Sequence, residues 1–131
     1  MTRTHVAESQ AAVNGLNSII HLKVTNIAHG LKMVQSQEML DMAKVHCVTF
    51  DLGISSNYLT GVWTNKEWHP INKMLADGLR VTLGTDDPVQ CCSSLDGEFK
   101  LTKQFGVTDD QRRQMQLIAE ENTDRYVRAS R

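Results

Sequence analysis

The chain alternates short apolar runs with amphipathic segments. Four runs have the composition of β-strands, being rich in β-branched residues or alternating polar with apolar positions, and cover residues 2–7, 24–28, 46–52 and 79–84. Apolar residues recur at helical spacing in 12–20, 36–43, 69–75 and 95–105, and a last helical segment opens at Thr108. This regular order of strand and helix predicts an α/β fold of four βα units around a parallel sheet.

Several boundaries carry their own signals. Ser36 is a suitable N-cap, and Thr108 with Gln111 three residues later has the form of a capping box that starts a long final helix. Gly78 stands where a glycine commonly ends a helix. Residues 53–68, GISSNYLTGVWTNKEW, are predicted to form a loop, and a loop of this length indicates a functional role.

Composition narrows the class of protein. The 131 residues are 40% apolar and 22% charged, with a net charge of −1, which is typical of a folded domain; we treat 1–131 as a single unit. No run of Lys or Arg suits a nucleic acid, and no apolar run is long enough to span a membrane. The sequence lacks a signal-peptide pattern, so we expect a cytoplasmic protein. Cys47, Cys91 and Cys92 have no metal-binding spacing and are expected to be reduced.

Polar residues that could bind a ligand or take part in catalysis follow each predicted strand. In parallel α/β folds the carboxyl ends of the strands gather at one rim, where ligands bind. We therefore expect one cluster at that rim, drawn from His5, Glu8, His29, Asp51, Ser55, Ser56, Asn57, Asp86 and Asp87.

Two adjacent carboxylates at the mouth of an apolar strand repel each other and resist burial, which points to a cation or polar ligand beside Asp86 and Asp87. Taken singly, each feature has a plain explanation. A His-x-x-Glu pair such as His5 and Glu8 is usually a solvated surface pair, and Thr-Asp-Asp-Pro could form an ordinary turn. Together, imidazole and carboxylate groups at one rim match the ligands of zinc.

Five motifs in order carry a resemblance to a known family. They are His5-Val-Ala-Glu8, Ala28-His29-Gly30, the segment SSNYLTGVW at 55–63, His69-Pro70, and Thr85-Asp-Asp-Pro88. With these motifs the sequence resembles the adenosine and AMP deaminase family, and more closely the adenosine deaminases, from end to end of the chain.

The resemblance implies that the four βα units are the second half, the last four units, of a TIM-type (β/α)8 barrel. It implies zinc-dependent hydrolytic deamination of adenosine or deoxyadenosine to inosine or deoxyinosine, a reaction of purine salvage. His5 and Asp86 would bind the zinc. Glu8 would be the general acid that protonates the purine ring, His29 would orient the attacking hydroxide, and Asp87 would bind N7 of the purine nucleoside substrate.

The sequence also departs from the family pattern. The family takes two more zinc ligands from a His-x-His pair, which this sequence lacks, and a complete barrel needs about 250 residues. At 51–54, Asp-Leu-Gly-Ile stands where the family commonly has Glu at the first position and Cys-Pro at the third and fourth, which bears on nucleoside preference. We therefore expect a partial catalytic domain.

A half-barrel leaves two open sheet edges, so we expect a missing N-terminal half-barrel or self-association to complete it. In the self-associated form, the last strand of one copy would pair with the first strand of a second copy and bring a second His5 beside Asp86. One alternative is a non-catalytic remnant that acts as a binding or assembly subunit. Another is an unrelated α/β domain with a polar rim.

Overall fold

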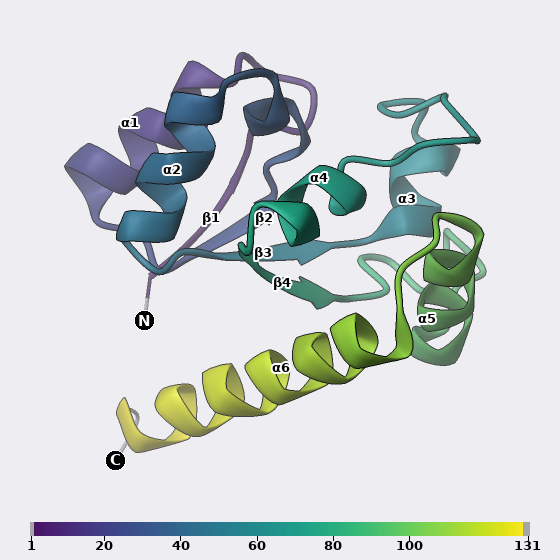
Figure 1. The fold of residues 1–131 in the computed structure, drawn as a ribbon. Helices are drawn as coiled ribbons and strands as arrows, with labels where there is room; N and C mark the ends of the chain where they lie inside the picture. The colour runs from purple at the N-terminus through teal and green to yellow at the C-terminus, as the bar shows by residue number, and fades with distance from the viewer. Residues whose placement is uncertain (1, 130–131) are drawn as a thin grey trace.

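The structure, a computed structural model, describes residues 2–129. It contains a four-stranded parallel sheet in the order β1-β2-β3-β4 (Figure 1). The strands are β1 (Arg3–Val6), β2 (Asn26–His29), β3 (Thr49–Leu52) and β4 (Arg80–Leu83). Strand order follows chain order, so every connection is a helical crossover between neighbouring parallel strands. The α/β prediction with a parallel sheet is confirmed.

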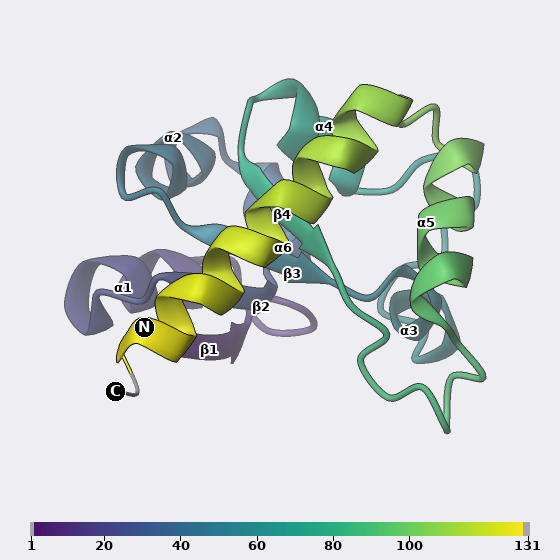
Figure 2. The same ribbon diagram turned by 90° about the horizontal axis from the view of Figure 1, so that it is seen from below.

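The helices lie on both sides of this sheet. In chain order they are α1 (Val13–Leu22), the 3₁₀ helix η1 (Leu31–Gln35), α2 (Gln37–Val45), α3 (Ile54–Leu59), α4 (Ile71–Ala76), α5 (Leu95–Gln104) and α6 (Asp109–Ala129). Helices α1, α2 and α4 lie on one side, whereas the long helix α6 lies on the other (Figure 1). Seen from below, α6 crosses in front of the strands (Figure 2).

The two faces of the sheet differ in chemistry because side chains alternate along each strand. One face carries Ile27, Phe50 and Val81, which share one register position and are fully buried in the main apolar cluster. The facing helices complete this core with residues such as Ile19, Leu40 and Met74. Burial of this apolar layer is the main force that holds the sheet and its crossover helices together.

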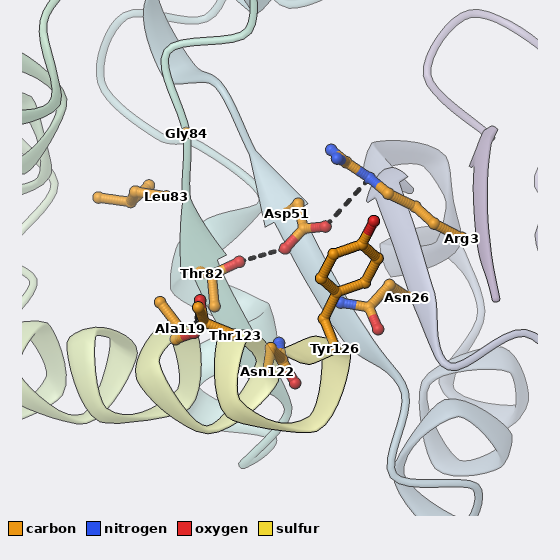
Figure 3. A pocket seen from close by; sticks show the side chains of 10 residues that line it. All are labelled: Arg3, Asn26, Asp51, Thr82, Leu83, Gly84, Ala119, Asn122, Thr123 and Tyr126. Carbon is orange, nitrogen blue, oxygen red and sulfur yellow. Dashed lines mark hydrogen bonds and ion pairs between the residues drawn. The ribbon is translucent and has the colours of Figure 1, made fainter. Parts of the chain in front are cut away.

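The opposite face of the sheet is polar. Helix α6 covers part of it and leaves a cavity of about 380 Å³, lined on the sheet side by Arg3, Asn26, Asp51 and Thr82 (Figure 3). The carboxylate of Asp51 accepts a hydrogen bond from the Thr82 hydroxyl and lies 3.3 Å from the Arg3 Nε atom. Asp51 thus has partners in both Thr82 and Arg3, so its charge is compensated on the sheet face that α6 partly covers.

Several local predictions can be compared with the structure. The capping box is confirmed: the Thr108 amide donates to the Gln111 side chain at 2.9 Å, and the Gln111 amide donates to the Thr108 hydroxyl at 3.2 Å. Ser36 occupies the N-cap position of α2, but its side chain makes no capping hydrogen bond. Gly78 ends α4 with a φ of 72°, as expected.

The prediction of a loop over 53–68 is wrong at its start. Residues 54–59 form helix α3, and only the segment after it is irregular. The Ser-Ser-Asn stretch has a weak intrinsic preference for helix, and a helix of this length is not stable by itself. Tertiary contacts therefore decide its structure.

Two further observations concern the described residues. All three cysteines are free thiols, as predicted. Within 2–129, none of the helices has the combination of length and apolar character needed to cross a bilayer.

Candidate active site

A cluster of titratable side chains lies at the carboxyl ends of β1 and β2. His5 belongs to β1, Glu8 follows that strand, and His29 is the last residue of β2. The His5 Nε2 atom lies 3.4 Å from one Glu8 oxygen, and the other Glu8 oxygen lies 3.4 Å from His29 Nδ1. One ligand atom from each of the three residues falls within 4.8 Å of the others. This spacing suits a shared cation.

Asp86 reaches this cluster from the end of β4. Its Oδ2 atom lies 3.9 Å from His29 Nε2 and accepts a hydrogen bond of 2.6 Å from the Ser56 hydroxyl. The three-residue group within 4.8 Å does not include Asp86, so Asp86 contacts it through His29. Five of the residues expected at the rim therefore lie together: His5, Glu8, His29, Asp86 and Ser56.

The backbone turns sharply where the strands end. Ala7, His29 and Asp86 have φ angles of 55°, 67° and 57°, in the left-handed region that residues other than glycine seldom adopt. Such angles persist only where the surrounding structure enforces them, and they gather at functional sites. These three left-handed residues lie at the ends of the strands, the same rim at which the titratable side chains gather.

His29 is the buried centre of the cluster. Burial is the main cause that lowers the pKa of its imidazole below the usual 6.5, and His5 acts in the same direction. Glu8 and Asp86 oppose that change. The lowered pKa favours the neutral ring at pH 7, in which one nitrogen donates and the other accepts a hydrogen bond.

The side chain of Asn57, on α3, contacts both Glu8 and His29. Its amide nitrogen is 3.4 Å from the Glu8 Oε1 atom and 3.2 Å from His29 Nδ1. Its Oδ1 atom is buried and makes no hydrogen bond within the described part of the chain. An amide N–H that donates to Nδ1 places the imidazole proton on Nε2, the atom that faces Asp86. Asn57 thus couples Glu8 to one tautomer of His29.

Other expected rim residues have different partners. Asp87 accepts hydrogen bonds from the amides of Val89 and Gln90, at 3.2 and 3.1 Å, so one of its oxygens is engaged in the turn after β4. Asp51 lies on the polar face of the sheet, where Arg3 and Thr82 are its partners (Figure 3).

The sequence analysis gave no role to Glu98, which is fully buried and binds the start of α3. It occurs in the first turn of α5, where an acidic residue is ordinary. Its long-range contact therefore has no local sequence signal.

Comparison with known families decides the assignment. The family model described as adenosine deaminase matches residues 2–123, nearly the whole chain. The chain belongs to the adenosine deaminase family. It is 26% identical to adenosine deaminase from Bos taurus over 116 residues, which cover 88% of this chain and 32% of the bovine protein. The chain thus spans about a third of the length of that relative.

Solved structures agree on the fold. The chain is similar to adenine deaminase from Arthrobacter aurescens, with a TM-score of 0.79 and 23% identity, covering 86% of this chain and 35% of that one. It is equally similar to an amidohydrolase from Burkholderia ambifaria solved with bound zinc, with a TM-score of 0.79 and 23% identity, covering 89% of this chain and 34% of that one. The four βα units therefore have the fold of part of a TIM-type (β/α)8 barrel.

Proposed function

We propose that this chain supplies part of the active site of a zinc-dependent hydrolase that converts adenosine or deoxyadenosine to inosine or deoxyinosine, in purine salvage. The observation that carries the proposal is the grouping of His5, Glu8 and His29 within 4.8 Å at the strand ends, in a chain of the adenosine deaminase family. A cytoplasmic location belongs to the same proposal, because three free thiols suit a reducing compartment.

The side chains present fit zinc. Imidazole nitrogens and carboxylate oxygens are its ordinary protein ligands, and the rim offers both kinds close together. His5 and Asp86 would hold the ion. When bound, zinc lowers the pKa of water enough to make hydroxide available at neutral pH. This half of the rim offers fewer ligands than a closed zinc site needs, so residues from other strands would complete it.

The positions of the remaining rim residues support a role for each of them in this reaction. Glu8 would be the general acid that gives a proton to the purine ring as water adds at C6 and ammonia leaves. The Asn57 side-chain amide donates to one of its oxygens and holds it in place. His29, neutral and with Nε2 as the protonated nitrogen, would orient the attacking oxygen and stabilise its charge. Asp87 would bind N7 of the purine, its carboxylate held by two backbone amides.

The proposal also includes a partner. Strands β1 and β4 are the edges of the sheet in the described residues, and unpaired strand edges accept further strands. Beside β1, helix α1 carries an apolar stripe at helical spacing: Val13 and Ile20 are 45% and 44% exposed, with Leu16 between them. A further βα unit would cover both features. It would come from a complementary half-barrel or from a second copy of the chain.

Sedimentation equilibrium tests the second-copy form. We expect a mass above the 14.7 kDa of one chain, reduced towards it by Ile20→Lys but not by Val45→Lys, a change at an exposed position of α2. A mass of one chain at all concentrations contradicts self-association. The complementary half-barrel is then the form of the partner that the proposal retains.

Ammonia release from adenosine and deoxyadenosine, in the presence of zinc, tests the activity. The assay uses the chain and any assembly that sedimentation resolves. Glu8→Gln should lower the rate by about 10²–10⁴-fold, as expected for loss of a general acid, while Glu38→Gln at an exposed site on α2 should not change it. No ammonia from a self-associated form, or from the chain together with a complementary half-barrel, contradicts the proposal. Thermal stabilisation by a purine-nucleoside transition-state analogue without turnover would instead favour a binding subunit.

A further inference from the structure

Glu98 is a carboxylate in the interior with an unusual set of partners. It lies on α5 and is fully buried. Its Oε2 atom accepts hydrogen bonds from the backbone amides of Ile54, at 2.7 Å, and Ser55, at 3.2 Å. These are the first two residues of α3, more than 40 positions earlier in the chain. A buried carboxylate is costly unless it is hydrogen-bonded, and here two amides of another helix satisfy it.

Helix α3 cannot supply this cap itself. Its N-cap residue is Gly53, which has no side chain to accept from the first free amides. A Cβ atom at Gly53 would lie 3.1 Å from the Cβ of Asp86, which is tighter than ordinary packing. The approach of the backbone to Asp86 therefore disfavours Ser, Thr, Asn or Asp at this N-cap, and the oxygen comes from Glu98 instead.

The two residues that follow the capped turn bind the candidate active site. Ser56 donates to Asp86, and Asn57 contacts Glu8 and His29. Helix α3 has only six residues, too few to hold its shape by internal hydrogen bonds alone. The position of its first turn therefore determines where Ser56 and Asn57 lie.

We propose that Glu98 is a positioning residue: by capping α3 it fixes Ser56 and Asn57, and through them the carboxylates of Asp86 and Glu8 and the ring of His29. Its relevance to deamination rests on the proposed function, but the positioning itself is independent of it. Glu98 does not touch the reacting groups, so its effect on them passes through α3.

The test is NMR of the isotope-labelled full chain without metal or substrate. The readout is the nuclear Overhauser effect between the Asn57 side-chain amide and the His29 ring, whose nitrogens lie 3.2 Å apart. Glu98→Ala should abolish this signal. Thr102→Ala is the matched control, because Thr102 is buried on the same helix and its hydroxyl donates to Phe99 within α5. The control should keep the signal at a comparable loss of stability.

Glu98→Gln provides the conservative rescue. Its carbonyl oxygen can take the place of Oε2, but a neutral oxygen accepts from the two amides more weakly than a carboxylate does. The signal should therefore weaken without disappearing, and hydrogen exchange should accelerate at the Ile54 and Ser55 amides. A folded Glu98→Ala variant with an unchanged signal overturns the proposal, as does an equal loss in Thr102→Ala. If Glu98→Ala does not fold, an unchanged signal and unchanged exchange in Glu98→Gln overturn it.

Activity separates this proposal from the proposed function. In an active assembly, Glu98→Ala should lower kcat by about 10–100-fold, the scale of a small displacement of catalytic groups, with partial recovery in Glu98→Gln. If the wild-type chain neither deaminates nor binds zinc, the proposed function fails while the NMR outcome still decides the role of Glu98. If deamination is found and the NMR signal is unchanged in Glu98→Ala, only the positioning role fails.

Discussion

The free energy of unfolding of this protein should fall at acid pH because of one fully buried histidine, His69. His69 is fully buried just before α4, with its ring centroid 5.7–6.1 Å from those of Tyr58, Trp63 and Phe105. Its Nδ1 atom accepts from the Ile71 amide at 3.2 Å, which places the ring proton on Nε2. That nitrogen is buried and has no hydrogen-bond partner among residues 2–129. The second N–H of an imidazolium would therefore bring an additional charge into the interior without an acceptor for it.

The magnitude follows from the pKa. Burial lowers the pKa of His69 from 6.5 to about 4, so the unfolded chain binds a proton there before the folded chain does. Stability is therefore complete above pH 6.5 and is lost as the pH falls towards 4. At about 1.4 kcal/mol per pH unit, this interval corresponds to a loss of about 3 kcal/mol in the free energy of unfolding.

The assay is urea denaturation at a series of pH values from 7.5 to 4, followed by the fluorescence of Trp63 and Trp68. The comparison variant is His69→Gln, which cannot titrate and can still accept from the Ile71 amide. Other groups titrate equally in both proteins, so the difference in unfolding free energy between wild type and variant isolates His69. It should fall by about 3 kcal/mol across the range. A difference that stays constant within about 0.5 kcal/mol would refute the reasoning.

Three further outcomes are expected. Gly30→Ala should cost about 2–5 kcal/mol in urea unfolding, because Gly30 has a φ of 65° and an added Cβ would lie 2.6 Å from the Phe50 ring; a loss below about 1 kcal/mol would contradict this packing. Thr108→Ala should lower the free energy of unfolding by about 1 kcal/mol because it removes the cap of α6, whereas Thr123→Ala at an exposed position should not lower it. Equal losses in the two variants would contradict the capping role. Zinc at about 100 times its Kd should stabilise the folded chain by about 2.7 kcal/mol in thermal unfolding and a chelator should reverse the gain; an unchanged Tm contradicts a folded-state site.

The sequence predicts the sheet well because its signals there are redundant. Each strand combines β-branched or alternating residues with flanking turn signals, and burial of Ile27, Phe50 and Val81 agrees with both. The rim follows from topology alone, since the carboxyl ends of parallel strands must meet. Residues as distant as Glu8 and Asp86 could therefore be placed near His29 before any coordinates were known.

What the sequence could not predict depends on contacts between distant segments. Helix α3 has poor local propensity and a glycine at its N-cap, and its first amides bind Glu98 on another helix. Asn57 was expected at the rim, but its contact with both Glu8 and His29 depends on the orientation of that helix. Helix α6 lies over the polar face of the sheet, and an ion pair of 2.7 Å between Arg80 and Glu121 links it to β4. This placement likewise has no local sequence signal.

Zinc titration of the labelled chain, followed by the imidazole signals of His5 and His29, tests the central claim most directly. Wild type and His21→Ala, a change at an exposed histidine of α1, should show the same saturable shift of both rings, and His5→Ala should bind zinc at least tenfold more weakly. Rings that do not respond to zinc, or an unchanged affinity in His5→Ala, would contradict the assignment of this rim as a metal-dependent active site.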